Sequence, residues 1–341
     1  MLKTKNTNNN SENITGRLPA FPAYTDLMAN LYLTHKCRRG CPFCFARKVV
    51  KEADNKDEIL TLEEIERFLD HYEGQLPIVG ILGGEPFQYP DLIKVIEIVR
   101  KRGIRAKIFT SATDPLPEGM EDLDISKGDL VFVVNVADRS TYNDRQFANL
   151  EHFFDKFHTI ASLSYTIFDI EHDDPSMFFD MIDRYGLVRN IRTGIALPIY
   201  KGGNQFIKLD EYKNAGEYLV ECVEKAAKRN IVMSLDCGFQ ACMFNDAQIG
   251  RLLKHGTTIG FMCGSALDIG PGLQAWNCFP LFQLGRVDAM DAKTIDELNC
   301  KLNAKLAETL GDAPGVLEEC ATCELRANGL CEGGCKSFKS F

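Results

Sequence analysis

Residues 36–44 read Lys-Cys-Arg-Arg-Gly-Cys-Pro-Phe-Cys, which places three cysteines within eight positions in the spacing C-x3-C-x2-C. The apolar segment Leu31 to Leu33, just before them, predicts a strand. Three thiolates on one short loop favour an iron–sulfur cluster over structural zinc, which takes four protein ligands. A cubane held by three thiolates keeps one iron open for a further ligand. On these residues alone, a zinc loop and a ferredoxin-like fragment remain alternatives.

The composition limits the class of protein. The chain has 341 residues, 45% of them apolar and 26% charged, enough for one large domain with a small one or for two of similar size. No run approaches the ~18 apolar residues of a membrane span, and the N-terminus lacks the apolar core of a signal peptide. Thirteen cysteines without a secretion signal predict metal or redox chemistry in a reducing compartment, the cytoplasm. The net charge of −9 argues against a protein that coats nucleic acid.

Three regions are expected along the chain. Residues 1–20 are rich in Asn, Thr and Ser and predict a disordered tail. Within residues 21–236, strand-like runs alternate with amphipathic helical stretches, which predicts an α/β fold with a parallel sheet and right-handed crossovers. Residues 237–341 change to cysteines, glycines and short apolar pieces, which predicts a small cysteine-rich domain. The strands are expected at 31–33, 77–82, 105–110, 130–136, 161–168, 191–196 and 231–235.

A second motif ends the second expected strand. Residues 80–86 read Gly-Ile-Leu-Gly-Gly-Glu-Pro. The pair Gly83-Gly84 lets backbone carbonyls approach a ligand with no Cβ in the way. Glu85, followed by Pro86, adds an acceptor for an ammonium group. Alone, this segment is equally consistent with a turn.

Together the two motifs resemble the radical S-adenosylmethionine (radical SAM) enzymes. The resemblance implies a partial (β/α)6 TIM-like barrel, in which the chemistry lies at the carboxyl ends of the strands. It implies a [4Fe-4S] cluster on Cys37, Cys41 and Cys44, with the amino and carboxylate groups of SAM on the open iron. An electron from the cluster then splits SAM into methionine and a 5′-deoxyadenosyl radical. It also implies that the GGEP motif, Gly83 to Pro86, binds the amino end of SAM.

Further SAM contacts are expected at other strand ends. Thr110 and Ser111 end the third strand, and Asn135 ends the fourth, where polar groups suit the ribose or the carboxylate. By resemblance, Arg145 is the residue that pairs with the SAM carboxylate. The alternatives are a surface ion pair for Arg145, and Arg192 in the sixth strand as the anion contact.

The C-terminal cysteines resemble the SPASM extension of radical SAM enzymes, which houses auxiliary [4Fe-4S] clusters. Cys263 and Cys278 flank a hairpin-like segment in the spacing Cys-x14-Cys. The later cysteines follow the spacing Cys-x2-Cys-x7-Cys-x3-Cys, without the further downstream cysteine of the family. Cys237 and Cys242, which follow Asp236, restore the count to eight, four for each of two clusters. The number of auxiliary clusters, one or two, stays open, and a zinc ribbon at residues 320–335 is the alternative. In the family the last cysteine crosses to the first auxiliary cluster. The predicted ligands are Cys237, Cys242, Cys263, Cys278, Cys320, Cys323, Cys331 and Cys335.

Cationic residues surround the first cysteine loop of this acidic chain. They predict docking of an acidic electron donor, a flavodoxin or ferredoxin, or of an anionic substrate; the alternative is a solvated loop that balances cluster charge. Cys222 falls on a helical apolar stripe and is expected in the core, whereas Cys300 falls off its stripe and is expected at the surface. The cations are Lys36, Arg38, Arg39, Arg47, Lys48 and Lys51.

The sequence therefore predicts a radical SAM enzyme that cleaves SAM reductively and abstracts hydrogen from a substrate. The resemblance implies a peptide or protein side chain that undergoes cross-linking or oxidation. Dehydrogenation of a small molecule, such as a sugar or aminocyclitol alcohol, is the first alternative. A non-catalytic iron–sulfur or zinc electron-transfer protein is the second. No catalytic acid or base is identified.

Overall fold

The computed structural model describes residues 28–47, 50, 57–172, 174–200, 202–263, 266–311 and 314–340. The expected tail, residues 1–20, lies outside them, as do Lys48 and Lys51. The helices are α2 (Leu62–His71), α3 (Leu92–Lys101), α4 (Asp144–Phe157), α5 (Ser176–Tyr185), α6 (Tyr212–Ala227), α7 (Asp246–Lys254), α8 (Ile295–Leu310) and α9 (Glu324–Ala327). The strands are β1 (Met28–Tyr32), β2 (Ile78–Leu82), β3 (Arg105–Thr110), β4 (Leu130–Asn135), β5 (Ala161–Ile167), β6 (Asn190–Ile195), β7 (Val232–Leu235), β8 (Leu267–Gly270), β9 (Gln274–Asn277) and β10 (Arg286–Asp288).

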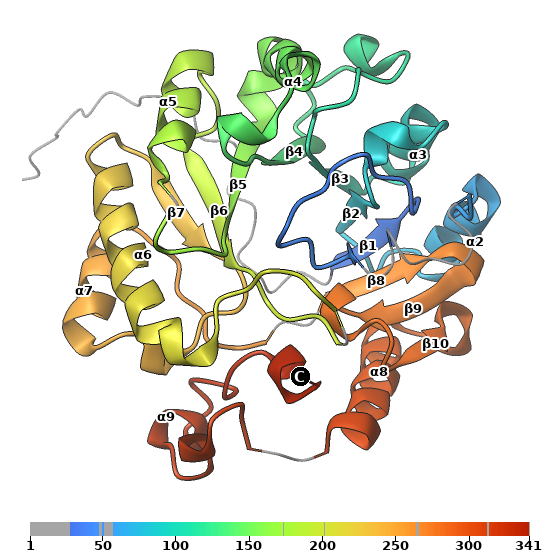
Figure 1. The fold of residues 1–341 in the computed structure, drawn as a ribbon. Coiled ribbons are helices and arrows are strands. Elements are labelled where there is room, and N and C mark those ends of the chain that lie inside the picture. Colours follow the sequence, from blue (N-terminus) through green and yellow to red (C-terminus); the bar gives the residue numbers. More distant parts are fainter. Residues whose placement is uncertain are drawn as a thin grey trace, which may run out of the picture.

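One sheet organises the described part of the chain. Its ten strands run in the order β10-β9-β8-β1-β2-β3-β4-β5-β6-β7. Strands β1 to β7 are parallel to their neighbours, and β8 joins β1 in parallel, with Asn30 opposite Asp268. Strands β9 and β10 add antiparallel hairpins at that edge. The sheet is not closed, because β7 and β10 are its two edges (Figure 1).

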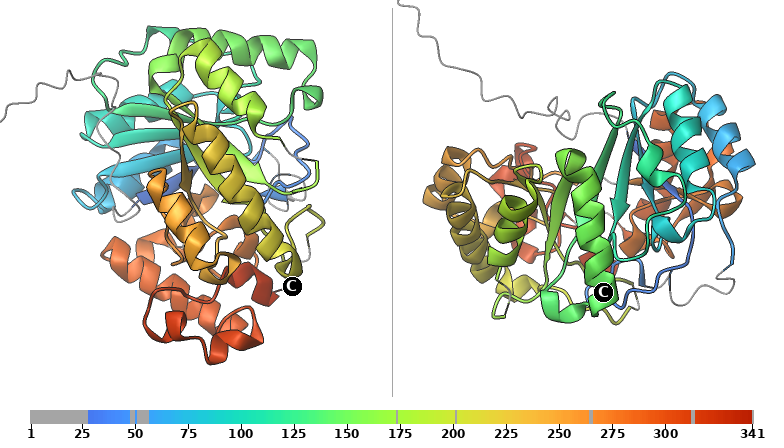
Figure 2. Two further views of the ribbon diagram at one scale, coloured as in Figure 1. Left: turned by 90° about the vertical axis from the view of Figure 1, so that its left-hand side faces the viewer. Right: turned by 90° about the horizontal axis from the view of Figure 1, so that it is seen from above.

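Helices cover the outer face of the curved sheet (Figures 1 and 2), and we call the side that its inner face encloses the lumen. Strand β3 shows how the sequence separates the two faces. Ala106, Ile108 and Thr110 are buried against the helices, and the alternate residues Lys107 and Phe109 are half-buried. Helix α2 begins with a capping box, in which Thr61 and Glu64 satisfy each other's backbone N–H groups.

The C-terminal segment crosses the open side of the sheet. In Figure 1 the red chain from α8 to the C-terminus passes beneath the lumen, between the hairpin edge and α6. The short helix η11 (Lys336–Ser340) contacts α8. Its Phe338 ring lies 5.8 Å from the ring of Tyr212 on α6 and 6.0 Å from that of Phe206. The last residues therefore connect the two sides of the open barrel.

The predicted α/β partial barrel is confirmed, and its seven parallel strands lie within a few residues of the expected ranges. The sheet is wider than a six-stranded barrel, because β7 and the C-terminal hairpin extend it at opposite edges. The hairpin expected between Cys263 and Cys278 is β8–β9. Cys222 is buried and Cys300 is exposed, as predicted. The boundary after Asp236 stays a prediction, since β8 is part of the barrel sheet.

No helix among the described residues is long and apolar enough to cross a membrane.

Two helix glycines predict opposite effects of the same substitution. A Cβ on the buried Gly216 of α6 would lie 2.4 Å from the Met243 carbonyl oxygen, whereas a Cβ on the exposed Gly250 of α7 meets nothing within 4 Å. Gly216→Ala should lower the free energy of unfolding by about 1–3 kcal/mol through overpacking. Gly250→Ala should raise it by up to about 1 kcal/mol through helix propensity. Thermal unfolding of both variants beside the wild type checks this; equal shifts would contradict the α6–Met243 contact.

Candidate active site

The cysteine loop is held against the motif that follows β2. Strands β1 and β2 are parallel neighbours, so their carboxyl ends meet at the same edge. Gly84 donates its N–H to the Thr34 carbonyl oxygen at 2.7 Å, and Glu85 donates to the Lys36 carbonyl oxygen at 2.8 Å. A Cβ on Gly84 would lie 2.3 Å from the Lys36 oxygen, so only glycine permits this approach. The two sequence motifs therefore form one structural unit.

The loop carries three thiols, those of Cys37, Cys41 and Cys44. Burial raises the pKa of the Cys37 thiol to about 12, and the thiolates of Cys41 and Cys44 raise it further. Cys37 and Cys44 also pack against a buried group that contains Tyr32, Trp276 and Phe279. Metal binding must displace the thiol protons, which a cluster of iron ions does readily. The donor set thus fits a cluster that takes three thiolates.

Glu85 connects β2 to β3. Its carboxylate is 2% exposed and accepts from the Thr110 hydroxyl at 2.5 Å, and from the Ser111 N–H at 2.8 Å and its hydroxyl at 2.5 Å. It also accepts from the Phe87 N–H at 3.2 Å. Burial raises the pKa of Glu85, and these bonds oppose the rise. The structure thus brings Glu85, Thr110 and Ser111 together, where the carboxylate fixes the two strand ends.

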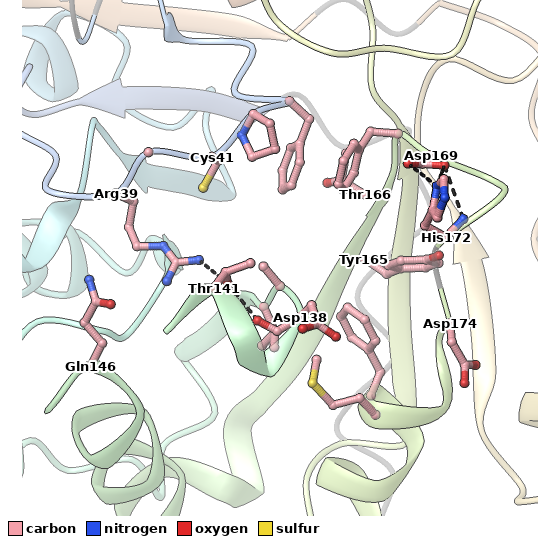
Figure 3. Close-up of a pocket in the computed structure, with 18 of the residues that line it drawn as sticks. Arg39, Cys41, Asp138, Thr141, Gln146, Tyr165, Thr166, Asp169, His172 and Asp174 are labelled. Carbon is pink, nitrogen blue, oxygen red and sulfur yellow. Dashed lines mark hydrogen bonds and ion pairs between the residues drawn. The ribbon is translucent and has the colours of Figure 1, made fainter. Parts of the chain in front are cut away.

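A cavity of about 530 Å³ opens beside Cys41 (Figure 3). Its walls come from the cysteine loop and from the residues after β4 and β5. Phe43 and Phe168 line it with ring centroids 4.8 Å apart. One side carries cationic Arg38 and Arg39, and the other carries polar and acidic residues. These are Asp138, Asp169, His172 and Asp174, with His172 Nδ1 bonded to Asp169 at 2.9 Å.

Two of the predicted SAM contacts, Asn135 and Arg145, do not line this cavity, and their role stays a prediction. Asn135 is exposed at the end of β4, and Arg145 is exposed in the first turn of α4, where Gln146 lines the cavity instead. Arg39 was missed as a cavity residue. Its guanidinium stacks 4.3 Å above the Tyr142 ring and donates to the Thr141 hydroxyl at 3.5 Å. The sequence signal for it was an arginine within the cysteine loop itself.

Ionisable groups also face the lumen below this edge. Arg192 on β6 pairs with Asp236 and donates to the Ser164 hydroxyl at 3.2 Å. Lys107 on β3 lies near both: burial lowers its pKa, Arg192 lowers it further, and Asp236 opposes the change. Alternation of charged and apolar residues in β3 would have predicted that Lys107 faces the lumen.

A buried carboxyl lies between the first cysteine loop and the C-terminal cysteines. Asp268 on β8 is 1% exposed and accepts from the Asn30 side chain at 2.8 Å. Burial raises its pKa to about 7. Its charge acts on Tyr32, which neighbours Cys37 and Cys44, and on Cys278. Among the described residues, no three His, Cys, Asp or Glu side chains are arranged to hold a single metal ion.

Residues 31–137 match the family model of the radical SAM superfamily. This segment is a radical SAM domain. It contains β1 to β4, the cysteine loop and the motif after β2. The predicted resemblance is confirmed, and the cysteine-rich C-terminal region fits the SPASM type. The radical SAM family implies a [4Fe-4S] cluster and SAM.

Solved structures share the architecture of the whole chain. Streptococcus suis SuiB, solved with its precursor peptide SuiA, has a TM-score of 0.66 and 15% identity, over 91% of this chain and 71% of SuiB. The enzyme anSMEcpe, solved with bound AdoMet, has a TM-score of 0.64 and 18% identity, over 91% of this chain and 89% of its own. These identities establish the shared fold.

A curated relative matches over a shorter stretch. It is the 7,8-dihydro-6-hydroxymethylpterin dimethyltransferase of Methanocaldococcus jannaschii, 29% identical over 84 residues. The match spans 23% of this chain and 16% of the relative.

Gly84→Ala should weaken cluster binding at the first cysteine loop, because its Cβ would collide with the Lys36 carbonyl oxygen. Strain of about 1–3 kcal/mol corresponds to a loss of cluster affinity or of SAM cleavage of about fivefold to somewhat over a hundredfold. Gly250→Ala is the control, since a Cβ on this exposed residue of α7, which does not line the cavity, meets nothing within 4 Å. Iron content and 5′-deoxyadenosine formation measure both. Equal behaviour of the two variants would refute the docked loop.

The raised pKa of Asp268 predicts that the free energy of unfolding depends on pH. A carboxyl whose folded pKa is about 7 costs stability as pH rises, because the unfolded chain ionises first, near pH 4. Relative to Asp268→Asn, the wild type should lose up to about 4 kcal/mol between those pH values. Thermal unfolding of both proteins from pH 5 to 8 tests this, and parallel pH profiles would contradict it.

Proposed function

We propose that this chain is an enzyme that cleaves SAM reductively and uses the resulting radical to abstract hydrogen from a peptide or protein side chain. The observation that supports it most is the joint unit of Cys37, Cys41 and Cys44 with the Gly84 and Glu85 backbone, beside a cavity large enough for a nucleoside. The radical SAM domain match covers the same residues.

The chain's own residues would act in three ways. When bound, the cluster and SAM supply the electron and the 5′-deoxyadenosyl radical. The three thiols hold the cluster, and the backbone of Gly83 and Gly84 approaches the amino end of SAM. Phe43 and Phe168 offer apolar walls for the nucleoside, and Arg39 offers a cation on the same cavity wall.

The proposed reaction removes two hydrogens from the substrate. One leaves as a hydrogen atom that converts the radical to 5′-deoxyadenosine. The other leaves as a proton and an electron, and new bond formation or unsaturation completes the product. Auxiliary clusters on the C-terminal cysteines are the proposed acceptors of that electron. Asp268 is a buried acid between the two cysteine regions, where it adjusts their electrostatic environment.

A peptide substrate is favoured by the fold. SuiB, which has this architecture over 91% of the present chain, was solved with a precursor peptide. Strands β7 and β10 are edges of the described sheet, and an extended peptide can bind a sheet edge by strand addition.

The polar groups of the lumen favour the second candidate, dehydrogenation of a small molecule. Lys107 and Arg192 outnumber Asp236 in that part of the lumen, and directed polar groups suit a small polar substrate. The same groups would also accept an acidic side chain of a peptide. A substrate test therefore has to separate the two.

An acidic electron donor, a flavodoxin or ferredoxin, remains the proposed partner. Part of the cationic loop already has acidic neighbours: Lys36 pairs with Asp57 at 2.9 Å, and Arg38 pairs with Asp114 at 2.9 Å. Both cations keep exposed surface for a donor. The proposed compartment is the cytoplasm, because all thirteen cysteines are free in the structure.

The test is anaerobic incubation with SAM and dithionite, followed by addition of candidate substrates. The wild type should form 5′-deoxyadenosine, and replacement of Cys37, Cys41 and Cys44 by Ala should abolish it. Peptides encoded beside the gene should yield products lighter by two hydrogens in mass spectra. 5′-Deoxyadenosine from the triple variant would overturn the proposed active site.

A second variant distinguishes the role of the C-terminal cysteines from that of the first cysteine loop. Replacement of Cys320 and Cys323 by Ala should preserve uncoupled 5′-deoxyadenosine formation and lose the product. If only a sugar or aminocyclitol stimulates the wild type, the small-molecule reaction replaces the peptide one. If the wild type never cleaves SAM, the non-catalytic electron-transfer protein replaces both.

A further inference from the structure

Two cationic side chains from separate strands of the sheet converge on one phenylalanine in the lumen. Lys107 and Phe109 are half-buried residues on the same face of β3, and Arg192 belongs to β6, which β4 and β5 separate from β3. The Lys107 Nζ lies 5.4 Å from the centre of the Phe109 ring, and the central carbon of the Arg192 guanidinium lies 5.8 Å from it. Both distances allow a cation–π interaction, so one ring gathers two positive charges.

Asp236 and Ser164 hold the Arg192 guanidinium in this group. Arg192 pairs with Asp236, which directly follows β7, and donates to the Ser164 hydroxyl of β5 at 3.2 Å. Burial lowers the pKa of Lys107 and the charge of Arg192 lowers it further, whereas Asp236 opposes the change. Two cations and one carboxylate therefore share a partly dehydrated site, where charge-assisted hydrogen bonds are stronger than in water.

The register of the sheet places this group next to the cavity that opens beside the first cysteine loop. Arg192 lies opposite Ser164, and Ser164 lies opposite Asn135, the exposed last residue of β4. Thr166, two residues after Ser164 on the same face of β5, lines the cavity. Because two residues of a strand span about 7 Å, the cationic group lies one side-chain level below the cavity wall.

The group is accessible from the lumen. The Arg192 side chain keeps 32% of its surface exposed, although the neighbouring Ser164 is 1% exposed. The alternating residues of β4 that do not pack in the main core are Val131 and Val133. These side chains and Ser164 are short and uncharged, so the two strands between the cations do not keep them apart.

A carboxylate matches the donors of this group. The Arg192 guanidinium presents a planar fork of N–H donors that pairs with both oxygens of a carboxylate, and the Lys107 ammonium adds a compact charge. The Phe109 ring offers an apolar face for the methylene groups next to the carboxylate. Because Asp236 offsets one of the two cations, the group suits a singly charged anion.

We propose that Lys107 and Arg192 form a binding site for a carboxylate of the substrate, one side-chain level below the cavity. This rests on the proposed function for the presence of a substrate in the lumen, and it names the class of substrate as a molecule that carries a carboxylate. In a peptide, the group is the side chain of Asp or Glu. In a small molecule, it is a free carboxylic acid. Asp236 is a positioning residue that orients the Arg192 guanidinium.

Equilibrium binding to the full chain, reconstituted anaerobically, tests the site without SAM cleavage. The probes are the blocked pentapeptide Gly-Gly-Glu-Gly-Gly, the same peptide with Gln in place of Glu, and free glutarate. In calorimetric titrations the wild type should bind the Glu peptide at least about tenfold more tightly than the Gln peptide, as charge-assisted hydrogen bonds require. Lys107→Met should remove most of this preference, and Lys107→Arg, which keeps the charge, should retain it. Lys94→Met, on an exposed residue of α3, is the matched control and should behave as the wild type.

The three probes also distinguish the two sources of the carboxylate. If glutarate binds with the same dependence on Lys107 and the Glu peptide does not, the site takes a small acid. Equal affinities of the two peptides, with no binding of glutarate, would overturn the site. A lower melting temperature of Lys107→Met with an unchanged preference for Glu would also overturn it, because the cation would then be structural. SAM cleavage is measured separately, so a wild type that binds the Glu peptide but never cleaves SAM would refute the proposed function and leave the site in place.

Discussion

Two backbone hydrogen bonds, from Gly84 to Thr34 and from Glu85 to Lys36, hold the cysteine loop in place. They exist because β1 and β2 are parallel neighbours whose carboxyl ends lie at one edge. They also require that position 84 has no Cβ, since any larger residue would push the loop away. Once the loop is fixed, Cys41 and Phe43 form one wall of the cavity, and the residues after β4 and β5 form the others. The geometry of the proposed active site thus follows from one close backbone approach.

Buried ionisable groups are concentrated around the lumen. Thiols there have raised pKa values, so the metal-free protein keeps them protonated, and assembly of a cluster has to release those protons. The resulting clusters would carry negative charge close to Arg192, whose positive charge opposes the rise that burial causes in the pKa of Cys237. Arg192 pairs with Asp236, the residue before Cys237, and Lys107 lies near both. These two cations would then balance the charge of a neighbouring cluster as well as that of a substrate.

The local parts of the fold could be predicted from the sequence, because strand runs, caps and cysteine spacings are short-range patterns. Glu85, Thr110 and Ser111 were chosen as strand-end residues, and parallel neighbouring strands brought them together. Pairing of β8 with β1 could not be predicted, because it depends on a contact between residues 238 positions apart, Asn30 and Asp268. Arg145 was predicted by resemblance; it lies exposed in the first turn of α4, and the next residue, Gln146, lines the cavity. Helix α7 was not predicted, although Asn245 and Gln248 form a capping box at its start; it is short, and Leu252 is its buried residue.

Two of the C-terminal cysteines follow strands that lie near opposite edges of the open sheet. Cys237 follows one edge strand, β7, while Cys278 follows β9 near the opposite edge. The C-terminal segment reaches across the open side, where the Phe338 ring packs on Tyr212 of α6 and near Phe206. Side-chain packing of this kind joins the two sides at one point, whereas hydrogen bonds between β7 and β10 would have sealed the edge strands along their whole length.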